Sequence, residues 1–237
     1  MLDFALLKTL SDCENLTLTD EMLEKLDIYA KLLVETNQKF NLTAITEPKE
    51  MTIKHFADCL AIFKYVDFKK NAKLIDVGTG AGFPGLVLKL VRPDLDVTFL
   101  DGTKKKLGFI DAVLAAVDLQ GETLHARAEE AGKNSQYRGQ YDYATARAVS
   151  NLPMLLEYAL PFLKTKGQFI SMKSATVGEE LDEAKKAISI LGGKVTQNIL
   201  FDLVEEMPRR VILIKKISQT PAKYPRPSAK IAKNPLK

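Results

Sequence analysis

The sequence predicts an α/β protein: a doubly wound, mostly parallel, seven-stranded sheet with an N-terminal helical extension. Two observations support this prediction. From Lys73 onward, short apolar runs alternate with segments of helical length, which is typical of parallel strands covered on both faces. Before that point, apolar residues recur at helical spacing. We therefore divide the chain into a helical section at 1–70, an α/β domain at 71–217 and a tail at 218–237.

The helical section predicts three helices, at residues 4–10, 19–38 and 48–65. The second has the clearest signals. Thr19 is a suitable N-cap, and Asp20 and Glu21 follow it in the first turn, where the helix dipole favours negative charge. Its apolar residues keep helical spacing through Met22, Leu26, Tyr29 and Leu33. We expect this section to pack on the domain that follows it.

The sequence pattern of the α/β domain predicts five strands separated by four helices. The strands are expected at 73–77, 96–101, 122–126, 141–145 and 167–172, and the helices at 84–92, 104–118, 151–163 and 178–191. Two further strands, at 194–204 and 209–217, are expected to close the sheet as an antiparallel pair. Alternating strands and helices of this kind predict helices on both faces of one sheet.

Composition excludes several classes of protein. The 237 residues are 46% hydrophobic and 27% charged, as in ordinary soluble domains. The two cysteines, Cys13 and Cys59, have no neighbouring Cys or His, which disfavours both a disulfide framework and a metal site. The chain lacks a basic leader and any apolar run near the ~20 residues that span a membrane. We expect a cytoplasmic monomer with no membrane or metal partner.

The net charge of +4 is unevenly distributed. Seven basic residues lie from position 215 onward, after the last acid, Glu206, so the preceding chain carries a net charge of −3. A basic tail is typical of a segment that binds an anionic partner, and equally of a solvated chain end. Four prolines between 220 and 237 argue against regular structure, so we expect a flexible tail whose Lys223 and Arg226 contact phosphate.

A glycine-rich turn follows the first strand of the sheet. Asp76 precedes the closely spaced glycines Gly78, Gly80 and Gly82, where a ligand can approach the backbone and the dihedral angles exclude a Cβ. A tight turn without a ligand is the alternative. Asp101 ends the second strand, near the ~20-residue offset at which an acid meets ribose hydroxyls in such folds. The spacing of the glycines differs from the Gly-x-Gly-x-x-Gly of dinucleotide-binding proteins, which counts against a nicotinamide dehydrogenase.

Asp76 and its glycines resemble motif I of S-adenosylmethionine-dependent methyltransferases. This resemblance implies a Rossmann-like methyltransferase sheet with S-adenosyl-L-methionine as cofactor. It also implies an adenine contact after the third strand, where Ala128 and Glu129 stand; a solvated helix start is the alternative for this acidic segment.

The residues after the fourth strand bear on the methyl acceptor. This region lacks the Asn/Asp-Pro-Pro-aromatic loop that orients exocyclic amines, and no cysteine is present there for covalent pyrimidine chemistry. Guanine N7 remains, because its lone pair needs no base and alignment alone accelerates transfer. Arg147 suits the methionine carboxylate or the O6 edge of guanine, with a surface ion pair as the alternative. Lys173 is a candidate phosphate contact or a solvated lysine.

Five ordered segments resemble the glucose-inhibited division protein B family. They are Asn41–Ile45, Lys54–Asp58, Asp76–Gly85, Thr145–Ala148 and Tyr224–Arg226. The resemblance implies an enzyme that methylates N7 of a guanine in the 530 loop of bacterial 16S rRNA, acting on the RNA or on the 30S subunit. It also implies that the cofactor contacts Gly78, Phe83, the Ala128–Glu129 pair and Arg147.

Two further residues in these segments are candidate RNA contacts. His55 lies three residues before Asp58 on a predicted helix, hence on the same face; helix anchoring is the alternative to RNA contact. Asn41 is placed to cap a turn or to meet RNA. Other functions stay open: a methyltransferase for a small molecule or protein, and a non-catalytic RNA-binding protein of the same fold.

Overall fold

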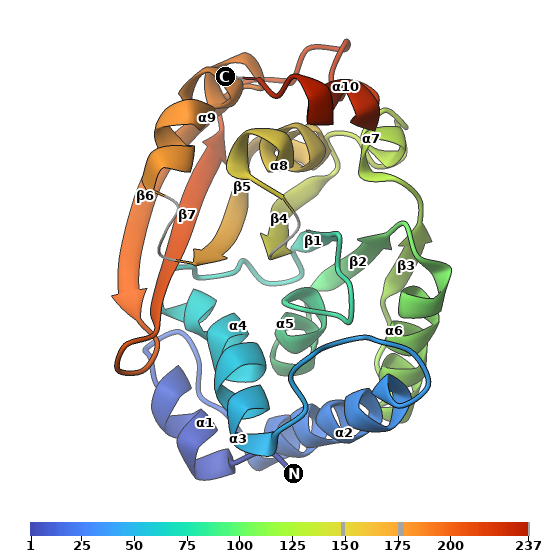
Figure 1. Cartoon of the computed structure of the whole chain (residues 1–237), viewed down its shortest axis with the longest axis vertical. Coiled ribbons are helices and arrows are strands. Elements are labelled where there is room, and N and C mark those ends of the chain that lie inside the picture. The colour runs from blue at the N-terminus through green and yellow to red at the C-terminus, as the bar shows by residue number, and fades with distance from the viewer. Residues whose placement is uncertain (148–149, 175–177, 237) are drawn as a thin grey trace.

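The computed structural model shows one seven-stranded sheet in the order β3-β2-β1-β4-β5-β7-β6 (Figure 1). It describes residues 1–147, 150–174 and 178–236, so Ala148 of the Thr145–Ala148 segment and Lys237 of the tail lie outside the described residues. The strands are β1 (Lys73–Val77), β2 (Asp96–Asp101), β3 (Glu122–His125), β4 (Tyr141–Arg147), β5 (Leu163–Ser174), β6 (Gly193–Asp202) and β7 (Pro208–Lys216). The first five are parallel, and β7 runs antiparallel to both of its neighbours. This confirms the predicted doubly wound, Rossmann-like sheet.

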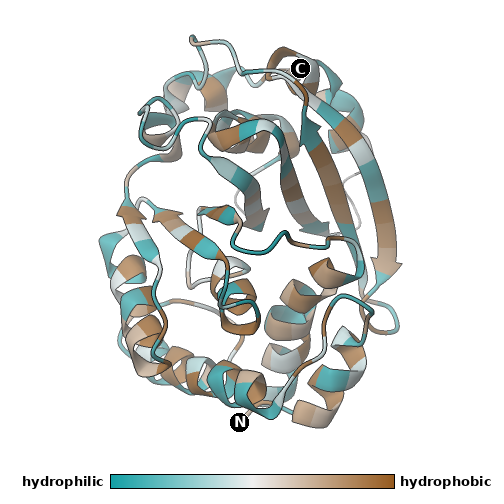
Figure 2. Ribbon diagram, turned by 180° about the vertical axis from the view of Figure 1, so that it is seen from behind, coloured by the Kyte–Doolittle hydropathy of each residue, from teal (hydrophilic) through white to brown (hydrophobic). Residues whose placement is uncertain are grey.

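The central strand β1 shows why these apolar runs form buried parallel strands. Leu74 packs into the hydrophobic cluster on one face of the sheet, whereas Ile75 and Val77 pack into the cluster on the other. All three are at most 1% exposed. A strand that is buried on both faces must be apolar at successive positions, which is the pattern seen in the sequence. The edge strand β6 instead mixes hydrophilic and hydrophobic residues (Figure 2), and all of it after Gly193 is at least partly exposed.

Helices cover the sheet in two layers (Figure 1). One layer holds the N-terminal helices α1 (Phe4–Ser11) and α2 (Asp20–Asn37) together with α5 (Gly85–Val91) and α6 (Lys104–Ala116). The other holds α7 (Ala128–Ala131), α8 (Leu152–Ala159), η3 (Leu160–Phe162) and α9 (Gly178–Ile190). The N-terminal section therefore shares a hydrophobic core with α5 and α6.

The N-terminal helices form where the sequence predicts them, with one change of helix type. The Thr19 side chain caps α2 by accepting a hydrogen bond from the Met22 amide. The predicted helix at 48–65 is instead a succession of short pieces: α3 (Pro48–Met51), the π-helix η1 (Thr52–Ala57), α4 (Asp58–Leu60) and the 3₁₀-helix η2 (Ala61–Lys64). π-helical turns are rare and occur often at functional sites.

The tail departs from its predicted lack of regular structure. Residues 228–233 form α10 (Ser228–Lys233), which lies beside α7 and α8 (Figure 1). Two apolar side chains explain this: Tyr224 is 7% exposed and Ile231 is fully buried. Lys216, one of the seven basic residues, is also buried. Its Nζ donates to the Leu191 carbonyl, and burial lowers its pKa to about 7.

Among residues 1–147, 150–174 and 178–236, no helix combines the length and the hydropathy that a membrane crossing requires. In the same residues, no three His, Cys, Asp or Glu side chains come together as metal ligands would.

Candidate functional site

A cavity of about 530 Å³ opens at the carboxyl ends of β1, β2 and β4. The order of the strands reverses at β1, and ligands of doubly wound sheets bind in the crevice at such a switch point. We call it the first cavity. Its walls include Thr43, His55, Val77–Ala81, Phe83, Asp101, Gly102, Lys106, Ala126–Glu129, Arg147, Tyr158 and Ser228. Seven of the eight predicted cofactor contacts thus line one cavity; the exception is Asp76.

Glycines form the wall of the first cavity that follows β1. Gly78 and Gly80 have φ angles of 70° and 59°, in the left-handed region that most residues avoid. Gly82 has a φ of 106°, and a Cβ there would lie 3.0 Å from the Tyr29 hydroxyl oxygen. That hydroxyl donates a 2.6 Å hydrogen bond to the Ala81 carbonyl. Helix α2 therefore holds the loop in place from behind.

Asp76 is fully buried below this loop rather than on the cavity wall. Its Oδ2 accepts from the Gly85 amide at 3.0 Å, and its Oδ1 accepts from the Thr145 hydroxyl at 3.0 Å. Burial raises the pKa of Asp76 to about 6, and these hydrogen bonds partly oppose that rise. The carboxylate joins β1 to β4 and to the start of α5.

Asp101 faces the cavity from the end of β2. One carboxylate oxygen accepts from the Gly80 amide at 3.0 Å, and the other accepts from the Thr103 amide at 2.8 Å. Each oxygen has a second lone pair, so the two amides fix the orientation of the carboxylate and leave acceptor capacity for a ligand.

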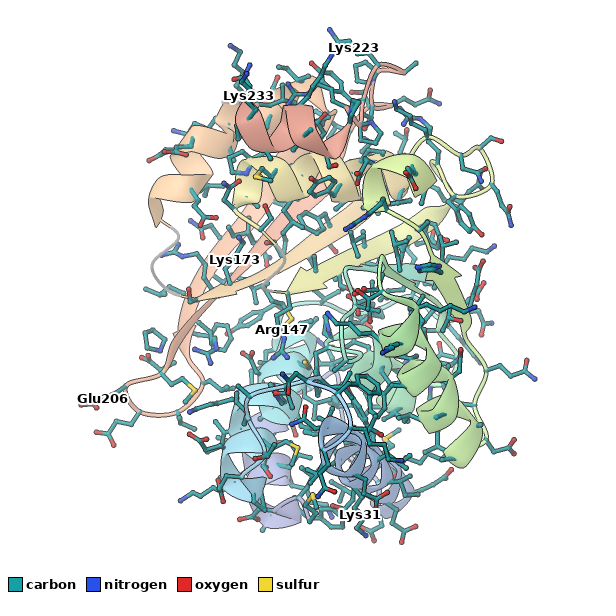
Figure 3. All side chains as sticks on the ribbon, turned by 45° about the vertical axis from the view of Figure 1, so that its right-hand side comes forward. Lys31, Arg147, Lys173, Glu206, Lys223 and Lys233 are labelled. Carbon is teal, nitrogen blue, oxygen red and sulfur yellow. The ribbon has the colours of Figure 1, made fainter. Side chains whose placement is uncertain are left out.

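Arg147, at the end of β4, contacts several groups at the junction of β4 with the N-terminal helices (Figure 3). Its guanidinium lies 4.9 Å from the centroid of the Phe83 ring. Nη1 donates to the Lys54 carbonyl at 3.0 Å and to Asp58 Oδ2 at 3.1 Å. The other oxygen of Asp58 accepts from Arg209 Nε at 2.9 Å, so a buried carboxylate joins two arginines.

His55 contacts both Arg147 and Phe83. Its ring stacks on Phe83 with centroids 4.5 Å apart. Arg147 Nη2 donates to Nδ1 at 3.3 Å, which assigns the proton to Nε2, and Nε2 lies 2.8 Å from the Thr43 hydroxyl. Burial, together with the Arg147 charge, lowers the pKa of His55 to about 4. The ring is therefore neutral at physiological pH.

A second cavity, of about 650 Å³, shares His55 and Arg147 with the first. It is rich in cationic side chains, and its walls include Lys54, Asp58, Asn151, Met172, Lys173, Glu180, Phe201, Arg209 and Arg210. Within the described residues, Arg210 Nε is buried without a hydrogen-bond partner. This cavity has the charge expected of a site for an anionic ligand.

Residues 22–204 match the family described as rRNA small subunit methyltransferase G. The chain is 46% identical to the ribosomal RNA small subunit methyltransferase G of Alkaliphilus oremlandii, over 94% of each protein. It is 49% identical to the protein of the same name from Acetivibrio thermocellus, over 92% of this chain and 90% of the relative. The chain belongs to this family.

Solved structures similar to this member of the methyltransferase G family support the fold. TrmN from Thermus thermophilus aligns with a TM-score of 0.52 at 17% identity, covering 70% of this chain and 53% of its own. M. jannaschii TYW2, solved in complex with AdoMet, aligns with a TM-score of 0.51 at 12% identity, covering 63% and 71%. Identities this low bear on the fold alone.

The predicted RNA contacts of this family member lie in different places. Lys173 lines the second cavity, where its ammonium pairs with Glu180 at 3.1 Å. Lys223 is exposed at the end of the molecule distant from Arg147 (Figure 3). Arg226 is paired with the buried carboxylate of Glu157. Asn41 is exposed and lines neither cavity. The structure therefore brings only Lys173 and His55 of this set together.

Sequence reasoning missed four residues that build the site. Tyr29 was assigned to an apolar helix face, and no local signal shows that its hydroxyl reaches the glycine loop. Arg209 follows a proline at the start of β7, far in sequence from Asp58. Tyr158 and Ser228 line the first cavity from α8 and α10. Each reaches the site through tertiary packing.

Proposed function

We propose that this protein transfers the methyl group of S-adenosyl-L-methionine to N7 of a guanine in the 530 loop of 16S rRNA. The observation that supports this most is the wall that the two cavities share. His55 and Arg147 line both, so a ligand in the cationic second cavity meets a ligand in the first at this wall.

The first cavity fits the cofactor in size and in chemistry. Pockets for small molecules typically enclose 300–1,000 Å³, and this one encloses about 530 Å³. Asp101 presents an oriented carboxylate suited to the vicinal hydroxyls of a ribose. Ala128 and Glu129 offer a backbone amide and an acceptor for adenine, and Gly78 and Gly80 allow close approach. When bound, S-adenosylmethionine supplies an electrophilic methyl group.

The shared wall suits the methionine end of the cofactor. Arg147 provides a cation for a carboxylate, and its contacts with Asp58 and Phe83 hold it in one position. Asp76 acts indirectly, by fixing the glycine loop through Gly85 and Thr145.

The second cavity is the proposed acceptor side. Its cations, Lys54, Arg209 and Arg210 among them, match the phosphates of RNA, and the side chains of Met172 and Phe201 offer apolar surface to a base. Its proposed ligand is the 16S rRNA, either free or within the 30S subunit, which places the activity in the cytoplasm.

The groups at the shared wall favour transfer without a general base. Guanine N7 carries an in-plane lone pair at neutral pH and needs no proton removed before attack. Both nitrogens of His55 are occupied by Arg147 and Thr43, and both oxygens of Asp58 are occupied by arginines. These side chains hold the neighbouring groups in position and exclude water from the site. The acceleration comes from alignment of the two ligands.

The direct test is methyl transfer from radiolabelled S-adenosylmethionine to three acceptors: 30S subunits, naked 16S rRNA and free guanosine. We expect label as 7-methylguanosine after nucleoside chromatography, and chemical cleavage at the modified base should map it to the 530 loop. Label in another nucleoside, or elsewhere in the RNA, would contradict the proposed position.

The absence of a general base has its own test. Single-turnover rates with saturating RNA are expected to be independent of pH above pH 6, in the wild-type protein and in His55→Gln. A pH dependence of the wild-type rate that disappears in His55→Gln would show that His55 takes part in proton transfer.

A further inference from the structure

The C-terminal segment, residues 220–236, packs against α7 and α8 instead of extending into solvent. Arg138, which follows α7, holds its beginning: Nη2 donates to the Thr220 carbonyl at 2.6 Å and Nη1 donates to the Tyr224 carbonyl at 2.8 Å. The buried side chains of Tyr224 and Ile231 complete the attachment. A segment held at several points has a defined position relative to the sheet.

Arg226 makes the strongest of these attachments. Its Nε and Nη2 donate to the two carboxylate oxygens of Glu157, at 2.9 and 2.8 Å, and its backbone amide donates to Oε1 at 2.7 Å. Glu157 is fully buried on α8. Two parallel hydrogen bonds between a guanidinium and a carboxylate fix both partners in orientation as well as in distance.

Residues next to this pair in the chain line one wall of the first cavity. Tyr158 follows Glu157 on α8, Ser228 follows Arg226 by two residues, and both line the cavity. Glu129 of α7 belongs to the same wall, and Figure 1 shows α7, α8 and α10 side by side. The position of Ser228 and Tyr158 therefore depends on the contact between Arg226 and Glu157.

We propose that the C-terminal segment is a working part of the cofactor site, in which Arg226 is a positioning residue and Ser228 a contact residue for the adenosine end. The pair of Arg226 with Glu157 holds this wall closed over the bound cofactor and sets how long it stays bound. This inference rests on the proposed function, which identifies the ligand as S-adenosylmethionine.

The same contacts argue against a tail that clamps phosphate through Arg226. Its guanidinium already faces a carboxylate that has no exposure to solvent. If Arg226 moved to a phosphate, it would leave that charge buried and unpaired, which is costly. Lys216, counted in the same basic tail, is buried as well. The positive charge of this end thus serves partly to attach the segment to the fold.

The test compares S-adenosylmethionine binding by wild-type protein, Arg226→Ala and Arg226→Lys, using calorimetry and stopped-flow dissociation. Arg226→Ala is expected to speed dissociation by about tenfold, since changes of this kind act mainly on the dissociation rate. Arg226→Lys keeps the positive charge but loses the two parallel hydrogen bonds to Glu157. Its dissociation rate should lie between those of the wild type and Arg226→Ala. Lys233→Ala, the same change of charge at an exposed site of the segment, is the matched control and should match the wild type.

A second ligand locates the effect. 5′-Methylthioadenosine lacks the amino-acid end of the cofactor, and its affinity should fall in Arg226→Ala as that of S-adenosylmethionine does. If only S-adenosylmethionine were affected, the assignment to the adenosine end would be wrong.

The other outcomes separate this inference from the proposed function. If the wild-type protein transfers methyl groups and Arg226→Ala releases S-adenosylmethionine at the wild-type rate, the inference is overturned and the function stands. If Arg226→Ala released S-adenosylmethionine at the wild-type rate but had a raised KM for 30S subunits, Arg226 would be an RNA contact, as the sequence predicts, and the inference would be wrong. If the wild-type protein binds no S-adenosylmethionine, both proposals are overturned. Arg226→Lys keeps the test open should Arg226→Ala not fold.

Discussion

Two walls of the first cavity are built in different ways. The glycine wall consists of one loop, Gly78–Ala81 with Phe83, and buried groups of the N-terminal helices support it, including Tyr29 and His55. The second wall, which we propose meets the adenosine end of the cofactor and call the adenosine wall, collects residues from α7, α8 and α10, and the C-terminal segment completes it. One wall thus depends on the core of the whole fold, whereas the other depends on the contacts that attach the C-terminal segment, among them the pair of Arg226 with Glu157. Changes behind the glycine wall should therefore lower global stability.

The largest effect is expected for Asp58→Ala, which removes the carboxylate between Arg147 and Arg209. Both guanidiniums would lose their partner in a largely buried site, and breaking such a pair costs about 3–5 kcal/mol in the free energy of unfolding. Urea denaturation measures this loss. Asp182→Ala, whose exposed carboxylate pairs with Lys185, is the control and should cost less than about 1 kcal/mol. Equal losses in the two variants would show that the core does not support this wall.

The second effect is a dependence of stability on pH that His55 causes. Because its pKa falls to about 4 in the folded protein from 6.5, the unfolded chain binds more protons between these values. Stability is therefore lost as pH falls from 6.5 toward 4, by up to about 3 kcal/mol at 1.36 kcal/mol per unit. His55→Gln removes this contribution. In urea titrations, the free energy of unfolding of the variant relative to the wild type should therefore rise as pH falls from 6.5 toward 4. A constant difference from pH 7 to pH 4 would contradict the neutral, buried His55.

The fold was predictable because its signals are local. Apolar runs such as Leu74–Val77 mark strands covered on both faces, and Thr19 marks the start of α2. The π-helix at Thr52–Ala57 was not predictable, since its extra residue per turn leaves no clear mark on a pattern of apolar residues. Helix α10 was missed because the prolines around it argue against helix, whereas burial of Ile231 stabilises it in the fold.

The same distinction between local signals and tertiary contacts applies to the residues of the site. Gly78, Gly80 and Asp101 could be placed in one cavity because a turn and a strand end at a known offset bring them together. Of the adenosine wall, only Ala128 and Glu129 could be predicted from the sequence. Ser228 reaches it through tertiary contacts, and no spacing in the sequence encodes the pairing of Arg226 with Glu157 across 69 positions.

The third effect concerns ligand binding at the glycine wall. Asp101→Ala should weaken S-adenosylmethionine binding by about 1.5–3 kcal/mol, the usual value for a hydrogen bond to a charged group. The Gly80 and Thr103 amides would also lose their acceptor, so stability should fall in parallel. Calorimetry with S-adenosylhomocysteine and its 2′-deoxy analogue distinguishes loss of the contact with the ribose from loss of support for the loop. A penalty of equal size for both ligands would assign Asp101 to holding the loop rather than to contact with the ribose 2′-hydroxyl.

The smallest effect is expected for Tyr29→Phe, which tests the support of the glycine wall with the least change in shape. The phenylalanine ring keeps the stacking on Phe83, whose centroid lies 5.2 Å away, and removes only the hydroxyl that donates to the Ala81 carbonyl. Loss of this buried hydrogen bond should lower the free energy of unfolding by about 1 kcal/mol. Tyr137→Phe, which removes an exposed hydroxyl bonded to Glu122, is the matched control and should cost less. Because the Ala81 carbonyl belongs to the loop itself, Tyr29→Phe should also weaken S-adenosylmethionine binding, and Tyr137→Phe should not. If stability fell while cofactor affinity stayed at the wild-type value, the glycine loop would keep its conformation without help from α2, and the contrast between the two walls would rest on Asp58 and His55 alone.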